Sequence, residues 1–308
     1  MTKAIQTTGL VKAYKTRKTR AEALNGIDIS VDSGDFCALI GPDGAGKTTL
    51  IKILCGMIGF DSGKVRLLNL ELPGGTRELK KSIAYLSQRF SLYGNLTVEE
   101  NVTYFARIFE VQNFRARMDK LLEAMNLEAF RDRLAKQLSG GMKQKLGVVC
   151  GLIHSPKILF LDEPTTGVDP VSRRELFRVI EEMLDEGLTV FMSTAYMDEA
   201  ERAHSVYMMD GGRIIDSGTF DSLSGSSGCT VYSITPRDSG RFLEEIRTVK
   251  GVRFASQIAE RVRVIAGGSV KLSELVSCGG GEPAPFTVLK PTMEDLFINR
   301  VMIGASVD

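Results

Sequence analysis

The chain has 308 residues, of which 43% are hydrophobic and 25% charged, a composition typical of a folded globular protein. Its 39 basic and 38 acidic residues give a formal charge of +1, which argues against nucleic acid as a partner, because affinity for a phosphate backbone needs a basic excess. No apolar run approaches the roughly 18 residues of a membrane-spanning helix, and the first residues lack the apolar core of a secretory signal. We therefore expect neither an integral membrane protein, nor a secreted one, nor a disordered chain.

Hydrophobic patterning predicts an α/β core. Residues 1–35 alternate apolar and polar side chains, which predicts short antiparallel strands, and Phe36–Ile40 is a compact apolar run that reads as a buried strand leading into a helix near Lys47. Residues 97–155 have helical periodicity instead, and they begin with the capping box Thr97-Val98-Glu99-Glu100. Strand-length and helical runs then alternate at Lys157–Leu161, Val171–Asp185 and Leu188–Met192.

The composition changes after residue 221. Residues 222–228 are rich in serine and glycine, which predicts a flexible linker. Beyond them we expect strands to alternate with helices, at Thr230–Ile234, Gly240–Val249, Val262–Ala266, Val270–Val276, Phe286–Leu289 and Met293–Val301. The predicted organisation is thus a main domain over 1–221 with a helical subdomain at about 90–155, the linker, and a small α+β accessory domain over 229–308.

One segment has the composition of a phosphate-binding loop. It fits the pattern G-x-x-x-x-G-K-S/T and reads Gly41-Pro42-Asp43-Gly44-Ala45-Gly46-Lys47-Thr48. Glycines let backbone N–H groups turn inward at a helix N-terminus, Lys47 adds a point charge for the β- and γ-phosphates, and the Thr48 hydroxyl can bind Mg²⁺. The string alone is also compatible with an ordinary glycine turn. Its place between a predicted strand and a predicted helix favours the phosphate site.

A second segment points to the same chemistry. The apolar run Lys157–Leu161 ends in two carboxylates, Asp162 and Glu163. At the tip of a buried strand, Asp162 is suited to hold a magnesium shell, and Glu163 beside it can polarise an attacking water. An acidic pair at a strand end is usually just solvated, but this reading is weaker when a phosphate loop precedes it in the chain.

Further motifs resemble those of ATP-binding-cassette (ABC) ATPases. Tyr14 is placed like the family's adenine-stacking aromatic residue, Gln88 follows the strand 83–86 as the Q-loop does, and residues 167–170 look like the D-loop. The family's LSGGQ-type signature is matched by Leu138-Ser139-Gly140-Gly141-Met142-Lys143-Gln144. The end of the chain, residues 289–297, is similar to tails of the drug-resistance-type subfamily, whose permeases are of the ABC-2 export class.

The resemblance implies an α/β fold: an ABC-type P-loop NTPase core with an N-terminal antiparallel β subdomain and a helical subdomain. ATP and Mg²⁺ are the implied cofactors. The resemblance implies catalytic roles for Glu163, Lys47 and Gln88, metal binding by Thr48, Gln88 and Asp162, and nucleotide contacts from Tyr14, Thr49 and the P-loop. It also implies a head-to-tail dimer in which the signature reaches the partner subunit's ATP through Ser139, Gly140, Gly141 and Gln144.

One position departs from the family's pattern. The family carries a histidine after the Ser-Thr that ends the strand following the D-loop helix, and this chain has Ala195 there. A methyl group cannot hydrogen-bond a γ-phosphate or hold water against Glu163, so we expect intact ATP binding and hydrolysis slowed on the order of a hundredfold. Two arrangements stay open. The chain can pair with a second, competent cassette, or form a homodimer in which Glu163 alone sustains slow turnover.

The leading hypothesis is therefore the ATP-binding subunit of a membrane exporter, cytoplasmic and held at the inner face of the membrane by an ABC-2-type permease. The apolar patch of Phe90, Leu92 and Tyr93 is its candidate docking surface. One alternative is a non-transport ABC ATPase acting in translation or DNA repair. Another is a regulatory module that senses ATP without hydrolysis, which Ala195 favours and Glu163 argues against.

Overall fold

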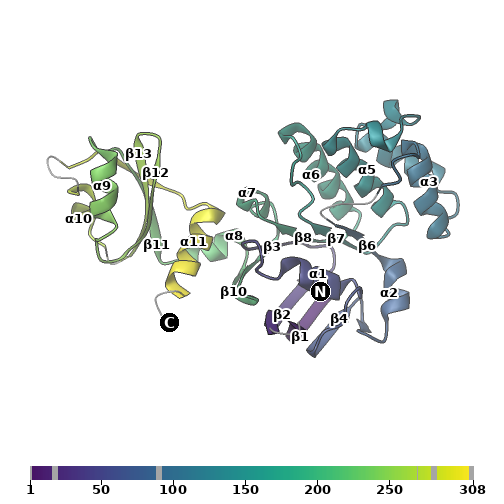
Figure 1. The fold of residues 1–308 in the computed structure, drawn as a ribbon, viewed down its shortest axis with the longest axis horizontal. Helices are drawn as coiled ribbons and strands as arrows, with labels where there is room; N and C mark the ends of the chain where they lie inside the picture. The colour runs from purple at the N-terminus through teal and green to yellow at the C-terminus, as the bar shows by residue number, and fades with distance from the viewer. Residues whose placement is uncertain (1, 16–19, 88–91, 269, 279–282, 305–308) are drawn as a thin grey trace. The chain divides into compact units, whose positions relative to one another are not determined.

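The computed structural model describes residues 2–15, 20–87, 92–268, 270–278 and 283–304. It divides into two compact units, one of Met1–Ala195 with Ala203–Ile214 and the other of Tyr196–Arg202 with Ile215–Asp308 (Figure 1). The predicted domain boundaries at 221 and 229 stay a prediction.

The first unit is built around two sheets. Its strands are β1 (Lys3–Lys15), β2 (Arg20–Asp32), β3 (Phe36–Ile40), β4 (Ser62–Leu67), β5 (Leu70–Glu71), β6 (Ile83–Leu86), β7 (Ile158–Asp162), β8 (Thr189–Thr194) and β9 (Ser205–Asp210). Its helices are α1 (Lys47–Leu54), α2 (Thr76–Ser82), α3 (Val98–Ile108), α4 (Arg115–Ala124), α5 (Gly140–Leu152) and α6 (Pro170–Asp185), with 3₁₀ turns at Glu128–Phe130 and Ala135–Gln137. Strand β10 (Arg213–Gly218) begins in this unit and ends in the second.

The larger sheet has the order β10-β9-β3-β8-β7-β6, and its pairs from β9 to β6 are parallel. All residues of β3, β7 and β8 are buried, as expected for central strands of a parallel sheet. Helices α3, α5 and α6 lie on one side of this sheet, and α1 lies on the other, with β1, β2 and β4 beyond it (Figure 1). The predicted α/β core, with its antiparallel and helical subdomains, is confirmed.

The smaller sheet has the order β2-β1-β4-β5 and is antiparallel. The prediction of short strands in the first 35 residues is wrong, because β1 and β2 each extend over 13 residues. Their pairing shifts register near Thr7 and Leu10, and such bulges let a long strand bend and continue. One buried cluster, including Ile5, Leu50 and Phe160, packs the two sheets and α1 together.

The predicted capping box begins the helical subdomain. Thr97 Oγ1 accepts a hydrogen bond from the Glu100 backbone N at 3.1 Å, and Glu100 Oε2 accepts one from the Thr97 N at 2.8 Å. The amide of Asn101, fully buried one residue further on, donates to the carbonyls of Tyr93, Leu96 and Thr97. The turn that precedes α3 is therefore tied to its first helical turn.

The second unit contains an antiparallel sheet of order β12-β13-β11-β14, made by β11 (Cys229–Ile234), β12 (Val252–Ile258), β13 (Arg261–Gly267) and β14 (Phe286–Leu289). Its helices are α7 (Met197–Ala200), α8 (Phe220–Ser226), α9 (Ser239–Ile246), α10 (Leu272–Val276) and α11 (Met293–Gly304). Val262 and Val264 pack with Phe242 of α9. Arg263 between them points to the other face, where it pairs with Asp295 of α11. The sheet therefore lies between two helical layers.

Helix α8 occupies most of the segment that its composition predicted as a flexible linker. Thr219 Oγ1 accepts a hydrogen bond from the Ser222 N at 3.1 Å and so caps the helix, and Leu223 is buried beneath it. A cap and one buried leucine are sufficient to order a short helix despite its serine-rich composition.

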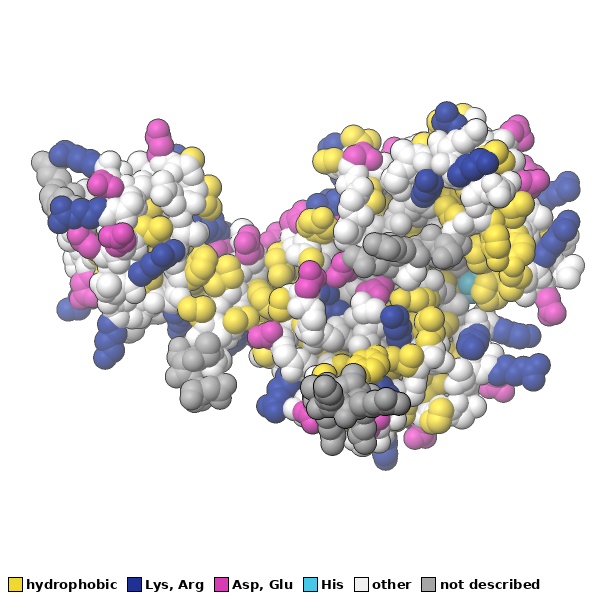
Figure 2. Space-filling model, in the orientation of Figure 1, with side chains coloured by type: hydrophobic (Ala, Val, Ile, Leu, Met, Phe, Trp, Pro, Cys, Tyr) yellow, Lys and Arg dark blue, Asp and Glu magenta, His cyan; other side chains and the backbone are white. Residues whose placement is uncertain are grey.

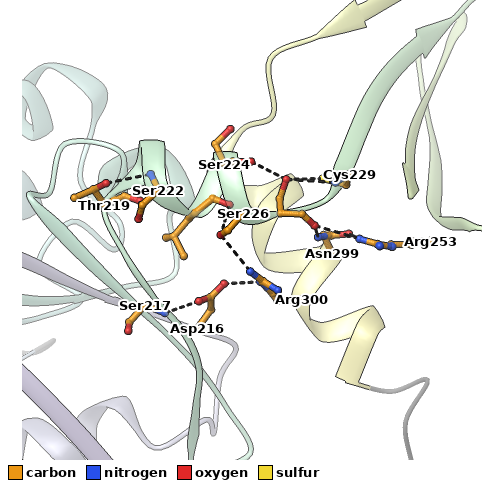
Figure 3. Close-up of polar contacts among 12 residues, drawn as sticks. Asp216, Ser217, Thr219, Ser222, Ser224, Ser226, Cys229, Arg253, Asn299 and Arg300 are labelled. Atoms are coloured by element: carbon orange, nitrogen blue, oxygen red, sulfur yellow. Dashed lines mark hydrogen bonds and ion pairs between the residues drawn. The ribbon is translucent and has the colours of Figure 1, made fainter. Parts of the chain in front are cut away.

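Polar contacts join α8, β12 and α11 within the second unit (Figure 3). Asn299 is fully buried; its Nδ2 donates to the Ser227 carbonyl at 3.0 Å, and its Oδ1 accepts from Arg253. Arg300 next to it pairs with Asp216 of β10. The last helix is thereby fastened to three other segments of the unit by groups that are largely removed from water.

We expect Asn299→Ala to lower the free energy of unfolding of this unit by about 2–3 kcal/mol, because a guanidinium N–H of Arg253 loses its acceptor and the buried Ser227 carbonyl keeps only a longer contact with Arg253, at 3.5 Å. Urea unfolding followed by circular dichroism measures the effect. Gln257→Ala, at an exposed position of the same sheet, is the control and is expected to change stability by less than about 0.5 kcal/mol. Equal stabilities of the two variants would show that the Asn299 contacts contribute little.

Candidate functional site

The predicted phosphate loop joins β3 to α1. Gly46, at the N-terminal end of α1, has a φ of 110°, and a Cβ there would lie 2.4 Å from the Ala23 carbonyl oxygen. Only glycine fits this turn, because both its backbone conformation and its close approach exclude a side chain. The loop can therefore lead directly into a helix whose first backbone N–H groups face the turn.

Lys47 folds back over the loop. Its Nζ donates to the carbonyls of Gly41 at 2.7 Å and Pro42 at 3.1 Å, and it lies 3.6 Å from Oε1 of Glu163. The lysine side chain is 4% exposed, and that of Glu163 is 15% exposed. A buried ammonium is stable only among such acceptors, so the positive charge is held at the mouth of the loop.

Three hydroxyl groups surround the Asp162 carboxylate at the end of β7. Thr48 Oγ1 donates to its Oδ1 at 3.1 Å, and Ser193 Oγ donates to the same oxygen at 2.7 Å. The Tyr85 hydroxyl donates to Oδ2 at 3.3 Å. Asp162 and Thr48, far apart in sequence, are thus brought together. Ser193 and Tyr85 are contacts that sequence reasoning missed.

Glu163 has an unusual backbone for a residue with a side chain, with a φ of 51°. Its N–H donates to both the carbonyl and the hydroxyl of Ser193, at 3.1 and 3.2 Å. Non-glycine residues in the left-handed region are uncommon and persist where the surroundings hold them. Here the turn directs the carboxylate from the end of β7 toward Lys47.

A pocket of about 380 Å³ opens over the loop. Its lining is made by Ala23, Asp43, Gly44, Ala45, Gly46, Lys47, Thr48, Thr49 and Glu163. The Tyr14 hydroxyl lies 3.5 Å from Thr49 Oγ1, and the tyrosine side chain is 44% exposed. An aromatic ring beside a phosphate-binding loop gives a flat surface on which a base can stack.

The signature segment forms the beginning of α5. Ser139 Oγ accepts a hydrogen bond from the Met142 N at 3.3 Å, and Gly140 and Gly141 form the first turn. A Cβ on Gly141 would lie 2.6 Å from Ser172 Oγ of α6, so only glycine allows the two helix starts to approach. Gln144, one turn further along, is half-buried. Among the described residues, the pocket lining includes none from this segment.

The D-loop segment leads into α6. Asp169 caps the helix by accepting from the backbone N–H groups of Val171 and Ser172, both at 3.0 Å. Hydrogen bonds from Ser172 lower the pKa of Asp169, so this carboxylate stays charged. Beside it, the Val171 side chain is 57% exposed, which is high for a large apolar residue.

Ala195 directly follows β8 and is exposed. Its side chain is a methyl group and has no polar atom. Gln88, predicted as a catalytic and metal-binding residue, lies outside the residues that the structure describes, as does Phe90 of the predicted docking patch.

Ser193 and Tyr85 carried a weak signal in the sequence. Ser193 is the serine of the Ser-Thr pair that ends a buried strand, and its partner position on β7 is Asp162 itself. No sequence motif marks either hydroxyl as a partner of Asp162, and only the parallel register of β6, β7 and β8 brings them to the carboxylate. In the described part of the chain, no helix has the length and apolarity to cross a bilayer.

Comparison with known proteins identifies relatives of this chain. The family model described as "ABC transporter" matches residues 24–166. The probable multidrug ABC transporter ATP-binding protein YbhF of Escherichia coli is 39% identical over 208 residues, which are 67% of this chain but only 36% of YbhF. The daunorubicin resistance ATP-binding protein DrrA2 of Streptomyces coeruleorubidus is 35% identical over 302 residues, covering 93% of this chain and 92% of DrrA2.

Solved structures give the same result. An ATP-binding subunit of an ABC transporter superposes with a TM-score of 0.67 at 28% identity, over 73% of this chain and 93% of that chain. The dimeric structure of MJ0796, a bacterial ABC transporter cassette, superposes with a TM-score of 0.65 at 24% identity, over 70% and 98% of the two chains, and shows the shared fold. From its motifs, its fold and these relatives, the chain belongs to the family of ABC transporter ATP-binding proteins.

Proposed function

We propose that this chain binds ATP with Mg²⁺ and hydrolyses it to drive a separate membrane permease. The observation that carries the proposal is the buried Lys47 ammonium, which lies at the mouth of a glycine-rich loop and 3.6 Å from Glu163. A fixed positive charge, inward backbone N–H groups and a carboxylate in one pocket form a site suited to a triphosphate and to a water that attacks it.

Each residue of the site has a proposed role. Lys47 contacts the β- and γ-phosphates, and Tyr14 stacks on the adenine. Glu163 polarises the attacking water, with Gln88 assisting. The backbone around the phosphates comes from Gly41, Pro42, Asp43, Gly44, Ala45, Gly46 and Thr49.

The residues at the end of β7 fit a magnesium ion. Thr48 and Asp162 present oxygen atoms 3.1 Å apart, and Mg²⁺ prefers oxygen ligands and usually takes only one or two from the protein beside phosphate and water. We propose that these two residues, with Gln88, hold the ion. When bound, the metal neutralises charge on the phosphate oxygens.

A dimer is proposed from the position and the chemistry of the signature helix. At the start of α5, Gly140 is exposed and the helix presents the positive end of its dipole, which attracts a phosphate. Its residues do not line the pocket of their own chain, as far as the structure describes it. We propose that Ser139, Gly140, Gly141 and Gln144 complete the site of a partner subunit, either a second copy or another cassette. MJ0796, of the same fold, is described as dimeric.

An exporter is the proposed assembly. The relatives include drug-resistance and Nod factor export ATP-binding proteins, which supports an exporter. An ABC-2-type permease as the partner, and with it the inner membrane face as the location, rests on the resemblance of residues 289–297. Hydrophobic side chains gather over α3 (Figure 2). On α3, Tyr104 and Ile108 are 37% and 55% exposed. The Tyr93 hydroxyl donates to that of Tyr104, so these side chains extend the predicted docking patch along the helix.

The test of the proposal is nucleotide binding. Isothermal titration calorimetry of Mg-ATP should give a single site, and Lys47→Ala should weaken it about 30-fold, because the phosphate loses a charge-assisted hydrogen bond worth about 2 kcal/mol. Lys64→Ala removes an exposed lysine of β4 and should leave the affinity unchanged. Equal affinities of the two variants would contradict the assignment of the pocket.

A second function is favoured by one observation, the exposed methyl group of Ala195. In this second function, the chain is a regulatory module that binds ATP and does not turn it over. Turnover under saturating Mg-ATP separates the two functions, because the module requires binding with no release of phosphate.

A further inference from the structure

The Asp162 carboxylate is held at both of its oxygens by side chains from different elements. Ser193 of β8 and Thr48 of α1 donate to Oδ1, and Tyr85 of β6 donates to Oδ2. A carboxylate bound at one oxygen can still rotate about its Cβ–Cγ bond. Donors at both oxygens fix the plane of the group, and with it the direction of the free lone pairs.

Tyr85 reaches this carboxylate from the edge of the sheet. Its strand β6 pairs with β7 in parallel, with Tyr85 beside Phe160 and Leu86 beside Leu161. The ring packs against the buried cluster that joins the two sheets and α1, which holds the hydroxyl in place. The hydroxyl that contacts Asp162 is therefore carried by a packed ring on a paired strand.

The chemistry of this phenol suits a permanent donor. The Tyr85 hydroxyl lies 3.3 Å from Asp162 Oδ2. An ionised carboxylate oxygen can only accept a hydrogen bond, so the phenol is the donor in this contact. Hydrogen bonds from such outer groups orient a ligating carboxylate and tune its metal affinity.

We propose that Tyr85 is a positioning residue for the Asp162 carboxylate and, through it, for the divalent cation that accompanies the nucleotide. The inference rests on the proposed ATP-binding function of the same site. Tyr85 contacts neither nucleotide nor metal in this role. It acts by holding one ligand in the orientation that the cation needs.

The test removes only the hydroxyl. In Tyr85→Phe, the affinity for fluorescent ATP measured in EDTA should equal that of the unchanged protein. The Mg²⁺ concentration that gives half of the magnesium-dependent gain in affinity should rise about tenfold, the size of effect typical for lost outer-shell contacts. The magnesium-free affinity also serves as the check that the site is folded.

A matched control is available in Tyr207, another partly buried tyrosine. Its hydroxyl donates to the Ser30 carbonyl at 3.0 Å and accepts from the Ser30 N at 2.9 Å, away from the pocket. Tyr207→Phe should leave the magnesium dependence unchanged. An identical magnesium dependence in Tyr85→Phe and the unchanged protein would overturn the inference while ATP binding stands. Absence of ATP binding in the unchanged protein would instead overturn the proposed function, and this inference with it.

Discussion

Ala195→His is expected to raise ATP turnover about a hundredfold at saturating Mg-ATP, with little change in KM. Ala195 directly follows β8, and Ser193, two residues before it, contacts both Asp162 and the backbone of Glu163. A side chain at residue 195 thus starts from the strand end that supports the two carboxylates. An imidazole there can donate a hydrogen bond to the γ-phosphate, a contact that strengthens as charge develops in the transition state. Phosphate release in a steady-state assay measures the effect.

Ala195→Leu is the control for this experiment, because it fills similar space without a hydrogen-bond donor and should leave turnover slow. The same substitution also distinguishes a homodimer from a pair with a second, competent cassette. If the chain forms a homodimer, both sites gain the histidine and the full increase is seen. If it pairs with a competent cassette, that site already turns over, and the rate of the complex at most doubles. An unchanged rate in the purified chain would contradict the account of the missing imidazole.

The phosphate loop could be predicted because its information is local. A strand, a glycine-rich turn and a helix follow one another within residues 36–54, and Gly46 is required by the approach of Ala23. The same holds for the capping box at Thr97, whose partners lie three residues apart. Local structures whose contacts join residues close together in the sequence can be predicted from short sequence patterns.

The contacts around Asp162 could not be predicted in the same way. Ser193 and Tyr85 lie 31 and 77 residues from it in sequence, and their hydroxyls meet the carboxylate only because β6, β7 and β8 pair in one register. A slip of one residue would turn these side chains to the opposite face of the sheet. Sequence periodicity identifies such strands but does not determine their register.

The second unit shows where composition misleads. Strand β12 was not predicted, because it lies at a sheet edge and mixes apolar residues with Arg253 and Gln257, so its alternation is weak. Residues 222–226 were predicted as part of a linker and instead belong to α8. In both segments tertiary contacts, such as the burial of Leu223, outweigh local preference.

Glu163→Gln is expected to lower turnover about 1,000-fold and to leave Mg-ATP affinity nearly unchanged. The glutamine has almost the same shape but cannot accept a proton from the attacking water. The φ of 51° and the two hydrogen bonds from the backbone N–H to Ser193 do not depend on the charge, so the turn should persist. The loss is best measured in the Ala195→His background, where the starting rate is high enough to follow.

The carboxylate of Glu163 also pairs with Lys47 at 3.6 Å, and this contact makes a second consequence testable. Without the negative charge of Glu163, the Lys47 ammonium interacts with the phosphates alone. ATP should therefore bind at least as tightly and remain uncleaved. Under the dimer proposal, the protein then accumulates as an ATP-bound dimer in size-exclusion chromatography, whereas Glu186→Gln, at a surface pair with Lys120, behaves as the unchanged protein. A Glu163→Gln variant that keeps its turnover would move the catalytic base elsewhere. A variant that binds ATP and stays monomeric would remove the signature helix from the reaction, because nothing would then bring α5 of one chain to the nucleotide of another.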